Sequence, residues 1–322
     1  MLSEFDLIKQ FFKRQRPGGA VLGIGDDCAL LAPAPGMQMA ISSDMLVEGR
    51  HFFAGADAAM LGHKCLAVNL SDLAAMGARP LGFTLALALP SADAAWLAPF
   101  SRGLLALADQ FECELIGGDT TKGPLTICIT IFGEVAPGQA LRRDAARPGD
   151  DIWISGSLGD ARLALAGYWN ETALNPDDLA LAAPRMHLPT PRVALGMALA
   201  RAGVAHAAID ISDGLVGDLG HILEASNVGA TLDVDALPPG PALARQPLAL
   251  RRSFCAAGGD DYELCFTAPP EARAAVLAAG AAAATAVTRV GTIDAASALR
   301  LLDAGGAALD LGLKGFDHFS PA

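Results

Sequence analysis

Acidic residues recur beside serines and glycines at several points in the chain. The stretches concerned are "GIGDD" (23–27), "SSD" (42–44), "NLSD" (69–72), "GGDT" (117–120), "DISDGL" (210–215) and "GGDD" (258–261). Most of them follow an apolar run that predicts a β-strand, and α/β sheets bind ligands at the carboxyl ends of their strands. Asp72 is the exception, because it lies in a predicted helix with Asn69 one turn earlier.

Carboxylates that converge on one site cannot all stay ionised without a counter-charge, because like charges raise one another's pKa. Mg²⁺ could supply that charge, since it prefers oxygen ligands from carboxylates, water and substrate phosphates. The neighbouring serines could add oxygen ligands, and the glycines would let the backbone approach a phosphate closely. This combination favours phosphoryl transfer, in which a protein mainly positions and neutralises charged groups.

A plainer interpretation competes with this one. A single aspartate after a strand is more often a helix cap or a turn residue, and Asp213 could cap a helix that starts at Gly214. Recurrence of the pattern favours the metal, although spacing alone does not bring the stretches together in space. The usual phosphate motifs are absent, since the chain contains no "GK" dipeptide and "GIGDDCA" lacks the last glycine of the dinucleotide fingerprint.

Composition limits the class of protein. The formal net charge is −12 and no basic stripe stands out, which argues against a nucleic-acid partner. The six cysteines include no C-x-x-C pair, which favours a reducing compartment over a zinc or redox role. Neither a secretory signal nor an apolar stretch long enough to span a bilayer is visible. We therefore expect a soluble cytoplasmic protein with no membrane partner.

Alternating strand-like and helix-like segments predict two α/β domains with mixed sheets, as the length of 322 residues also suggests. A Pro/Gly/Arg stretch at 136–150 is the expected connection, so the domains should cover residues 1–137 and 148–322. Strands are predicted over 37–42, 82–89, 113–118, 125–135, 151–155, 205–211, 230–234, 262–267 and 288–293. Helices are predicted over 57–76, 92–111, 160–168, 191–202 (capped by Thr190) and 214–226.

Several longer blocks resemble one enzyme family. In chain order they are "GIGDDCALL", "SSDMLVEGRHF", "NLSDLAAMGARP", "GGDTTKG", "RPGDDIWISGSLGDA", "DISDGL", "GGDDYEL" and "GFDHF". They resemble the thiamine-monophosphate kinases, within the superfamily of aminoimidazole ribonucleotide synthetase. The resemblance runs from Glu4 to Phe319.

This resemblance implies a two-domain synthetase-like α/β fold. The N-terminal domain would carry metals and ATP and form a dimerising β-sheet or barrel, followed by a C-terminal α/β domain. The implied partners are ATP, thiamine monophosphate and a second copy of the chain, with several Mg²⁺ ions as cofactors. The implied reaction moves the γ-phosphoryl group of ATP to thiamine monophosphate, in line and without a covalent enzyme intermediate or a general base.

The resemblance also implies roles for individual residues. The metal ligands would be Asp27, Ser42, Ser43, Asp44, Asp72, Asp119, Asp210 and Asp213. The ATP contacts would be Gly118, Asp119, Arg143 and Ser212. The thiamine-phosphate contacts would be His51, Glu263 and Phe316, with Phe319 as the alternative aromatic residue. One departure is Asp144, which follows Arg143 where the family usually has serine and could partly neutralise that guanidinium.

Two other functions remain open at this point. The chain could be another ATP-using member of the superfamily with a different acceptor, which a panel of substrates would reveal. It could also be a catalytically silent Mg-nucleotide sensor, although all the acidic positions are filled. Without the resemblance, a histidine such as His51 is as often a solvated surface residue as a substrate contact. Phe316 could likewise belong to the core.

Overall fold

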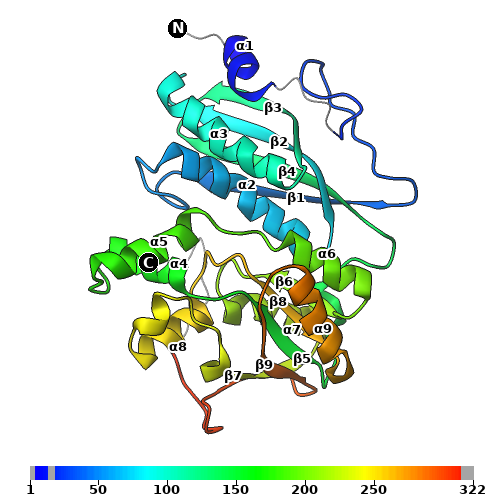
Figure 1. Ribbon diagram of the computed structural model, residues 1–322, viewed down its shortest axis with the longest axis vertical. Helices are drawn as coiled ribbons and strands as arrows, with labels where there is room; N and C mark the ends of the chain where they lie inside the picture. Colours follow the sequence, from blue (N-terminus) through cyan, green and yellow to red (C-terminus); the bar gives the residue numbers. More distant parts are fainter. Residues whose placement is uncertain (1–3, 14–18, 313–322) are drawn as a thin grey trace. The chain divides into compact units, whose positions relative to one another are not determined.

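Two β-sheets form along the chain in the computed structural model, which describes residues 4–13 and 19–312 (Figure 1). Contacts divide the chain into two units. Unit 1 comprises residues 1–73 and 78–138, and unit 2 comprises residues 74–77 and 139–322. Each unit contains one of the two sheets, so the mixed α/β class predicted from the sequence is confirmed.

Unit 1 is built on a four-stranded sheet in the order β1-β4-β2-β3. Its strands are β1 (Gln38–Val47), β2 (Arg79–Leu89), β3 (Glu114–Lys122) and β4 (Thr126–Val135). The pairs β1–β4 and β4–β2 are antiparallel, whereas β2–β3 is parallel. Because β1 and β3 are the two edges, this sheet is open, and of the two expected forms, sheet or barrel, the chain adopts the sheet.

One face of this sheet is covered by helices α2 (Ala58–Ala75) and α3 (Ala94–Gln110) (Figure 1). Alternation along the strands produces that face, since successive side chains point to opposite sides. On β4, Ile127, Ile129 and Ile131 are at most 1% exposed, whereas the residues between them are half-buried. The opposite face, which we call the open face, carries those intervening residues. Before the sheet lie the short helices α1 (Glu4–Leu7) and η1 (Ile8–Phe12).

Unit 2 contains a six-stranded sheet in the order β10-β7-β9-β5-β8-β6, in which only β10–β7 is parallel. Its strands are β5 (Asp151–Ser155), β6 (Ala207–Asp210), β7 (Gly229–Asp233), β8 (Leu264–Ala268), β9 (Val287–Asp294) and β10 (Leu299–Leu302). Its α-helices are α4 (Asp160–Tyr168), α5 (Pro176–His187), α6 (Val193–Ala202), α7 (Leu215–Ser226), α8 (Leu248–Ala257) and α9 (Arg273–Ala282). Short 3₁₀ turns are η2 (Arg143–Ala145), η3 (Val234–Ala236), η4 (Leu243–Arg245) and η5 (Pro270–Ala272).

Some element boundaries differ from the sequence prediction. Helix α6 begins after Arg192 without a side-chain cap, so the predicted capping by Thr190 is wrong. Helix α7 follows Gly214, whose φ of 110° starts the turn, and Asp213 makes no cap there. Glu263 lies immediately before β8 rather than within it. None of the helices in the described part of the chain combines the length and apolar character that crossing a bilayer needs.

Helices α2 and α3 approach each other through two glycines. A Cβ at Gly62 would lie 2.1 Å from the carbonyl oxygen of Phe100, and a Cβ at Gly103 would lie 1.9 Å from that of Ala59. Only hydrogen at these positions permits backbone contact between the helices. This contact fixes the position of α2, and therefore of Asp72, over the sheet.

We expect Gly103→Ala to lower the free energy of unfolding by about 1–3 kcal/mol, because the added methyl group forces the two helix backbones apart. Gly217→Ala in α7 is the matched control, since a Cβ there meets nothing within 4 Å. Alanine should stabilise that helix by up to about 1 kcal/mol. Urea unfolding followed by circular dichroism compares the two variants, and equal midpoints would contradict the close-packing argument.

Candidate functional site

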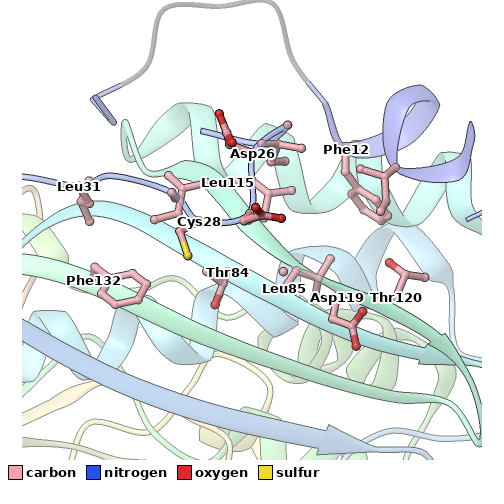
Figure 2. Close-up of a pocket in the computed structure, with 18 of the residues that line it drawn as sticks. Phe12, Asp26, Cys28, Leu31, Thr84, Leu85, Leu115, Asp119, Thr120 and Phe132 are labelled. Atoms are coloured by element: carbon pink, nitrogen blue, oxygen red, sulfur yellow. The ribbon is translucent and has the colours of Figure 1, made fainter. Parts of the chain in front are cut away.

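A cavity of about 920 Å³ in unit 1 brings two of the acidic stretches together (Figure 2). Its lining includes Asp26 and Asp27 from one stretch, and Gly118 and Asp119 from the other. The segment that carries Asp26 passes over the strands, and Asp119 lies at the cavity from β3 (Figure 2). Apolar side chains from the open face, among them Ile41, line the same cavity.

The backbone conformation and the lack of space at position 118 require glycine. Its φ is +146°, and a Cβ there would lie 1.9 Å from the carbonyl oxygen of Leu85 on the neighbouring strand β2. Any side chain would therefore separate β3 from β2. Asp119, the next residue, pairs with Ala86 and is exposed. The glycine thus places an accessible carboxylate next to a backbone that a ligand can approach closely.

The serines of "SSD" point to opposite faces of β1. Ser42 Oγ donates a hydrogen bond to Asp72 Oδ2 on α2, so Ser42 and Asp72 lie together on the helix-covered side. By alternation Asp44 shares that side. Ser43 Oγ lies 3.0 Å from Thr130 Oγ1 on β4 and donates to the carbonyl oxygen of Ile129. The four predicted ligands from β1 and α2 therefore divide between the two faces of the sheet.

His51 lies just beyond β1 and is half-buried. Its ring Nδ1 accepts a hydrogen bond of 3.0 Å from the backbone N–H of Val47. The backbone N–H of His51 donates to the carbonyl oxygen of Val47. Since Nδ1 acts as the acceptor, the neutral ring carries its proton on Nε2. The ring is thus oriented by the end of the strand that carries Ser42 and Asp44.

In unit 2 the stretches "DISDGL" and "GGDDYEL" are hydrogen-bonded to each other. The N–H of Asp260 donates to the carbonyl oxygen of Ser212, and that of Tyr262 to the carbonyl oxygen of Ile211, both at 2.8 Å. The N–H of Ile211 donates in turn to the carbonyl oxygen of Glu263 at 2.8 Å. Asp260 and Tyr262 adopt φ values of 67° and 49°, a region that costs a non-glycine residue about 1–3 kcal/mol. Two acidic stretches therefore meet at one end of this sheet, as the sequence analysis expects of a site.

Within "DISDGL" the three predicted residues differ in exposure. Asp210 is the last residue of β6 and is 5% exposed, Ser212 is half-buried, and Asp213 is exposed. Asp213 is thus the most accessible carboxylate of the three.

Two buried aspartates that the sequence analysis does not assign a role support these loops. A single oxygen of Asp218, Oδ2, accepts the N–H groups of Ser212 and Asp213 at 3.0 and 3.1 Å. Burial raises the pKa of Asp218 to about 6. Asp261 is 1% exposed and both its oxygens accept the N–H of Gly159 at 2.9 Å. Burial raises the pKa of Asp261 well above its ordinary value. Asp218 follows Asp213 at a spacing typical of a first-turn helix residue, which is the one sequence signal for its role.

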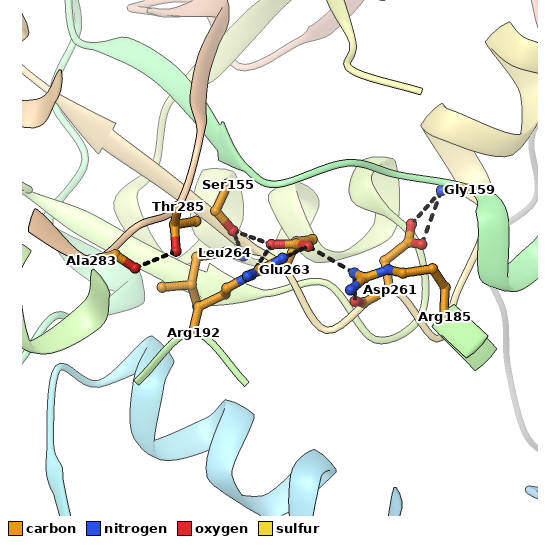
Figure 3. A network of polar contacts seen from close by, with 9 residues as sticks. All are labelled: Ser155, Gly159, Arg185, Arg192, Asp261, Glu263, Leu264, Ala283 and Thr285. Carbon is orange, nitrogen blue, oxygen red and sulfur yellow. Dashed lines mark hydrogen bonds and ion pairs between the residues drawn. The ribbon is translucent and has the colours of Figure 1, made fainter. Parts of the chain in front are cut away.

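Glu263 is fully buried among two arginines and a serine (Figure 3). Its carboxylate accepts hydrogen bonds from Arg185 on α5, from Arg192 before α6 and from Ser155 at the end of β5. Neither arginine is predicted as a site residue from the sequence. They come from different helices, and only the fold brings them to one carboxylate.

Arg143, the predicted ATP contact, is exposed in η2. The neighbouring Asp144 accepts hydrogen bonds from Arg142, with Arg142 Nε at 2.7 Å from Asp144 Oδ1. The expected neutralisation of Arg143 by Asp144 is therefore wrong, because Asp144 pairs with the other arginine. The guanidinium of Arg143 makes no hydrogen bond with the residues that the structure describes.

Phe316, and Phe319 as its alternative, lie outside the described residues. Across residues 4–13 and 19–312, no group of three or more His, Cys, Asp or Glu side chains is arranged to hold a metal ion. The structure brings together Ser42 with Asp72, Asp27 with Asp119, and the 210–213 segment with residues 259–263.

Two family models match this chain. Residues 25–135 match the N-terminal domain of AIR synthase related protein, and residues 147–303 match the C-terminal domain of the same family. The fold and the acidic stretches thus define a two-domain protein of the AIR synthase related class.

Comparison with individual relatives identifies the family within this class. The chain is 45% identical to a thiamine-monophosphate kinase from Salmonella typhimurium, over 98% of each protein. It is 47% identical to the crystal structure of a thiamine-monophosphate kinase from Stenotrophomonas maltophilia, with a TM-score of 0.83 over 90% of this chain and 92% of that one. A structure of AaThiL complexed with AMPPCP and TMP is 26% identical, with a TM-score of 0.75 over 89% of each chain. The chain belongs to the thiamine-monophosphate kinase family.

The raised pKa of Asp218 predicts a pH dependence of stability. The folded pKa is about 6, above the ordinary value of 3.8, so between these values the folded chain holds a proton that the unfolded chain has released. Stability contributed by protonated Asp218 is therefore lost as pH rises through this window, by about 3 kcal/mol at most. We expect Asp218→Asn to lack this loss, because its amide oxygen can still accept both N–H groups.

The measurement is the free energy of urea unfolding between pH 4 and 7 with a chelator present, for the natural chain and the variant. As pH rises, the free energy of unfolding of Asp218→Asn should increase relative to that of the natural chain. Parallel pH profiles would contradict the assignment to Asp218.

Proposed function

We propose that this chain transfers the γ-phosphoryl group of ATP to thiamine monophosphate, giving thiamine diphosphate. The observation that carries this proposal is the 45% identity to a thiamine-monophosphate kinase over 98% of both proteins. The neighbour complexed with AMPPCP and TMP supports the same pair of substrates. The acidic stretches support it independently, because they suit a reaction between two highly charged anions.

The proposed reaction does not need a strong general base. The acceptor is a phosphate monoester, whose ionised oxygen is already a nucleophile near neutral pH. The main barrier is the repulsion between two anionic phosphates, which is worth several kcal/mol at close range in a protein. The protein therefore has to hold the phosphates in line and offset their charge.

Mg²⁺ is the cation that these residues suit. The predicted ligands are carboxylates and hydroxyls, which are hard oxygen donors, and no thiol or imidazole is among them. Asn69 adds an orphaned oxygen, since its buried Oδ1 makes no hydrogen bond with any described residue one turn before Asp72. When bound, Mg²⁺ would neutralise phosphate charge and hold the phosphate oxygens. The proposed ligands are Asp27, Ser42, Ser43, Asp44, Asp72, Asp119, Asp210 and Asp213.

Other residues would bind the substrates directly. Gly118 and Ser212 would approach the nucleotide with Asp119, and the unpaired guanidinium of Arg143 would meet its phosphates. His51 and Phe316 would contact thiamine monophosphate, whereas Glu263, the third predicted contact, is fully buried and would act through the two arginines that bind it. Residues 1–137 would form the N-terminal domain that binds metals and ATP and dimerises, and residues 148–322 would form the C-terminal α/β domain.

We further propose a homodimer formed through the open face of the unit 1 sheet. Ile41 and Met45 on edge strand β1 are 62% and 56% exposed, and alternation places them on that face with Phe132. Exposed apolar side chains that adjoin one another are typical of an interface. A second copy is the proposed occupant, because the same patch on both chains would be self-complementary in a two-fold dimer. The free state of all six cysteines supports a cytoplasmic location.

Purified protein incubated with Mg·ATP and thiamine monophosphate should form thiamine diphosphate, measured by chromatography, and should form none without magnesium. Asp210→Asn should fold but lose about 100-fold or more in turnover, because a neutral amide is a poor ligand for a hard cation. Asp177→Asn is the matched control, since Asp177 is exposed in the first turn of α5. Near-normal turnover of Asp210→Asn would remove its metal role, and the absence of product from the natural chain would refute the function.

Ile41→Asp should convert the dimer to a monomer, because a charge buried in an apolar interface lacks a partner. Light scattering coupled to size-exclusion chromatography measures the mass in solution. Leu277→Asp on α9 is the control, since Leu277 is similarly exposed (54%) but lies in unit 2. A monomeric natural chain, or a dimer that persists in Ile41→Asp, would overturn this interface.

A further inference from the structure

The carboxylate of Glu263 has no capacity left for a ligand. Its Oε1 accepts hydrogen bonds from Nη2 of Arg185 at 2.7 Å and from Nη2 of Arg192 at 2.5 Å. Its Oε2 accepts from Ser155 Oγ and from Nε of Arg192, both at 2.6 Å. An ionised carboxylate offers about four acceptor positions, and these bonds occupy all of them.

The surroundings of Glu263 exclude a ligand as well. The side chain is 0% exposed. The backbone at the end of β5 lies against it, since a Cβ at Gly156 would fall 2.2 Å from Oε1. A carboxylate in this position is stabilised only by partners that supply charge and hydrogen bonds. Glu263 therefore acts through the groups that it contacts.

The two arginines, by contrast, keep unused donors. A guanidinium carries five N–H groups in a fixed plane. Arg185 uses only Nη2, which donates to Glu263 and to the carbonyl oxygen of Asp261 at 3.0 Å. Arg192 uses Nε and Nη2. With the residues described, Nε and Nη1 of Arg185 and Nη1 of Arg192 make no hydrogen bond.

These arginines also reach solvent. Their side chains are 18% and 16% exposed, whereas Glu263 between them is not exposed at all. Figure 3 shows the two guanidinium groups approaching Glu263 from different sides. Two guanidinium groups share one hydrogen-bonded carboxylate, and the buried Asp160 and Asp261 also lie within electrostatic range of Arg185. This arginine pair lies beside the 210–213 segment, because Ile211 is hydrogen-bonded to the backbone of Glu263.

We propose that Arg185 and Arg192 form an anion-binding subsite that holds the phosphate of the acceptor, and that Glu263 fixes their geometry rather than touching the substrate. The inference rests on the proposed kinase function for the identity of the anion. Planar guanidinium groups suit phosphate because they offer paired, charge-assisted hydrogen bonds. The subsite would let the enzyme distinguish thiamine monophosphate from thiamine, which lacks the phosphate.

A structural role is the competing explanation, since the arginines also connect α5 and the start of α6 to the residue before β8. The two roles differ in what a substitution does to ligand preference. Loss of a phosphate contact weakens binding of thiamine monophosphate and spares thiamine. Loss of structure, or of a contact between Glu263 and the thiamine rings, weakens both ligands alike.

The experiment measures binding of thiamine monophosphate and of thiamine to the full chain by calorimetry. Arg185→Gln is the main variant, because Glu263 keeps Arg192 and Ser155 as partners. We expect its affinity for thiamine monophosphate to fall about 10-fold or more, with thiamine affinity unchanged. The KM for thiamine monophosphate should rise while the KM for ATP stays constant. Arg185→Lys, which retains the charge, should recover part of the preference.

Arg245→Gln is the matched control, since Arg245 in the same unit is itself exposed and also pairs with a buried carboxylate, that of Asp178. It should leave both affinities unchanged. An equal loss for both ligands in Arg185→Gln, or no loss, would overturn the subsite, and Arg185→Lys gives the same test if the glutamine variant does not fold. A natural chain that forms no thiamine diphosphate would instead refute the proposed function, so the two failures are distinguishable.

Discussion

Burial of carboxylates is the constraint on which the candidate site in unit 2 depends. Asp218, Asp261 and Glu263 are each at most 4% exposed. A polar or charged group removed from water must be matched by donors, and each of the three is matched differently. Asp218 binds the amides of 212–213, Asp261 binds the amide of Gly159, and Glu263 binds two guanidinium groups. The bonds of Asp261 and Glu263 join segments that are far apart in sequence, and those of Asp218 hold the loop just before its own helix, so the loops hold one arrangement.

The acidic residues thus fall into two groups with different work. Asp218, Asp261 and Glu263 are buried and act inward on backbone amides and arginines. Asp27, Asp119 and Asp213 are exposed and retain free oxygens for a cation. In unit 2 the exposed Asp213 needs the buried acids, because accessible carboxylates in flexible loops would be held apart by mutual repulsion. Backbone hydrogen bonds between residues 211–212 and 260–263 supply the rigidity that a cation site requires.

Much of the fold could be predicted because burial follows apolar alternation, as on β4, where Ile127, Ile129 and Ile131 face the helices. The ends of the strands could not be predicted, because backbone pairing decides them. Strand β1 continues past Asp44 to Val47, and β3 continues past Asp119 to Lys122. Three helices escape prediction for local reasons. Pro184 inside α5 reads as a break, although Asn175 caps its start. Helix α9 is mostly alanine and therefore shows no clear apolar period. Helix α8 is amphipathic, but it begins after Pro247 without a side-chain cap that would signal its start.

For the site, the sequence indicates the acidic stretches but not which acids are buried. Asp210, Asp213 and Asp218 occur within one short segment, and only tertiary contacts distinguish their environments. Arg185 and Arg192 are harder still to predict, because two prolines separate them, and Arg185 lies in α5 whereas Arg192 precedes α6. A site for two anionic substrates must be positive overall, yet this chain is acidic. In the proposed site, exposed acids would resolve that conflict by holding a cation, and the buried Glu263 would resolve it by holding two arginines. Glu263 and Asp213 would therefore differ in mechanism while serving the same electrostatic need.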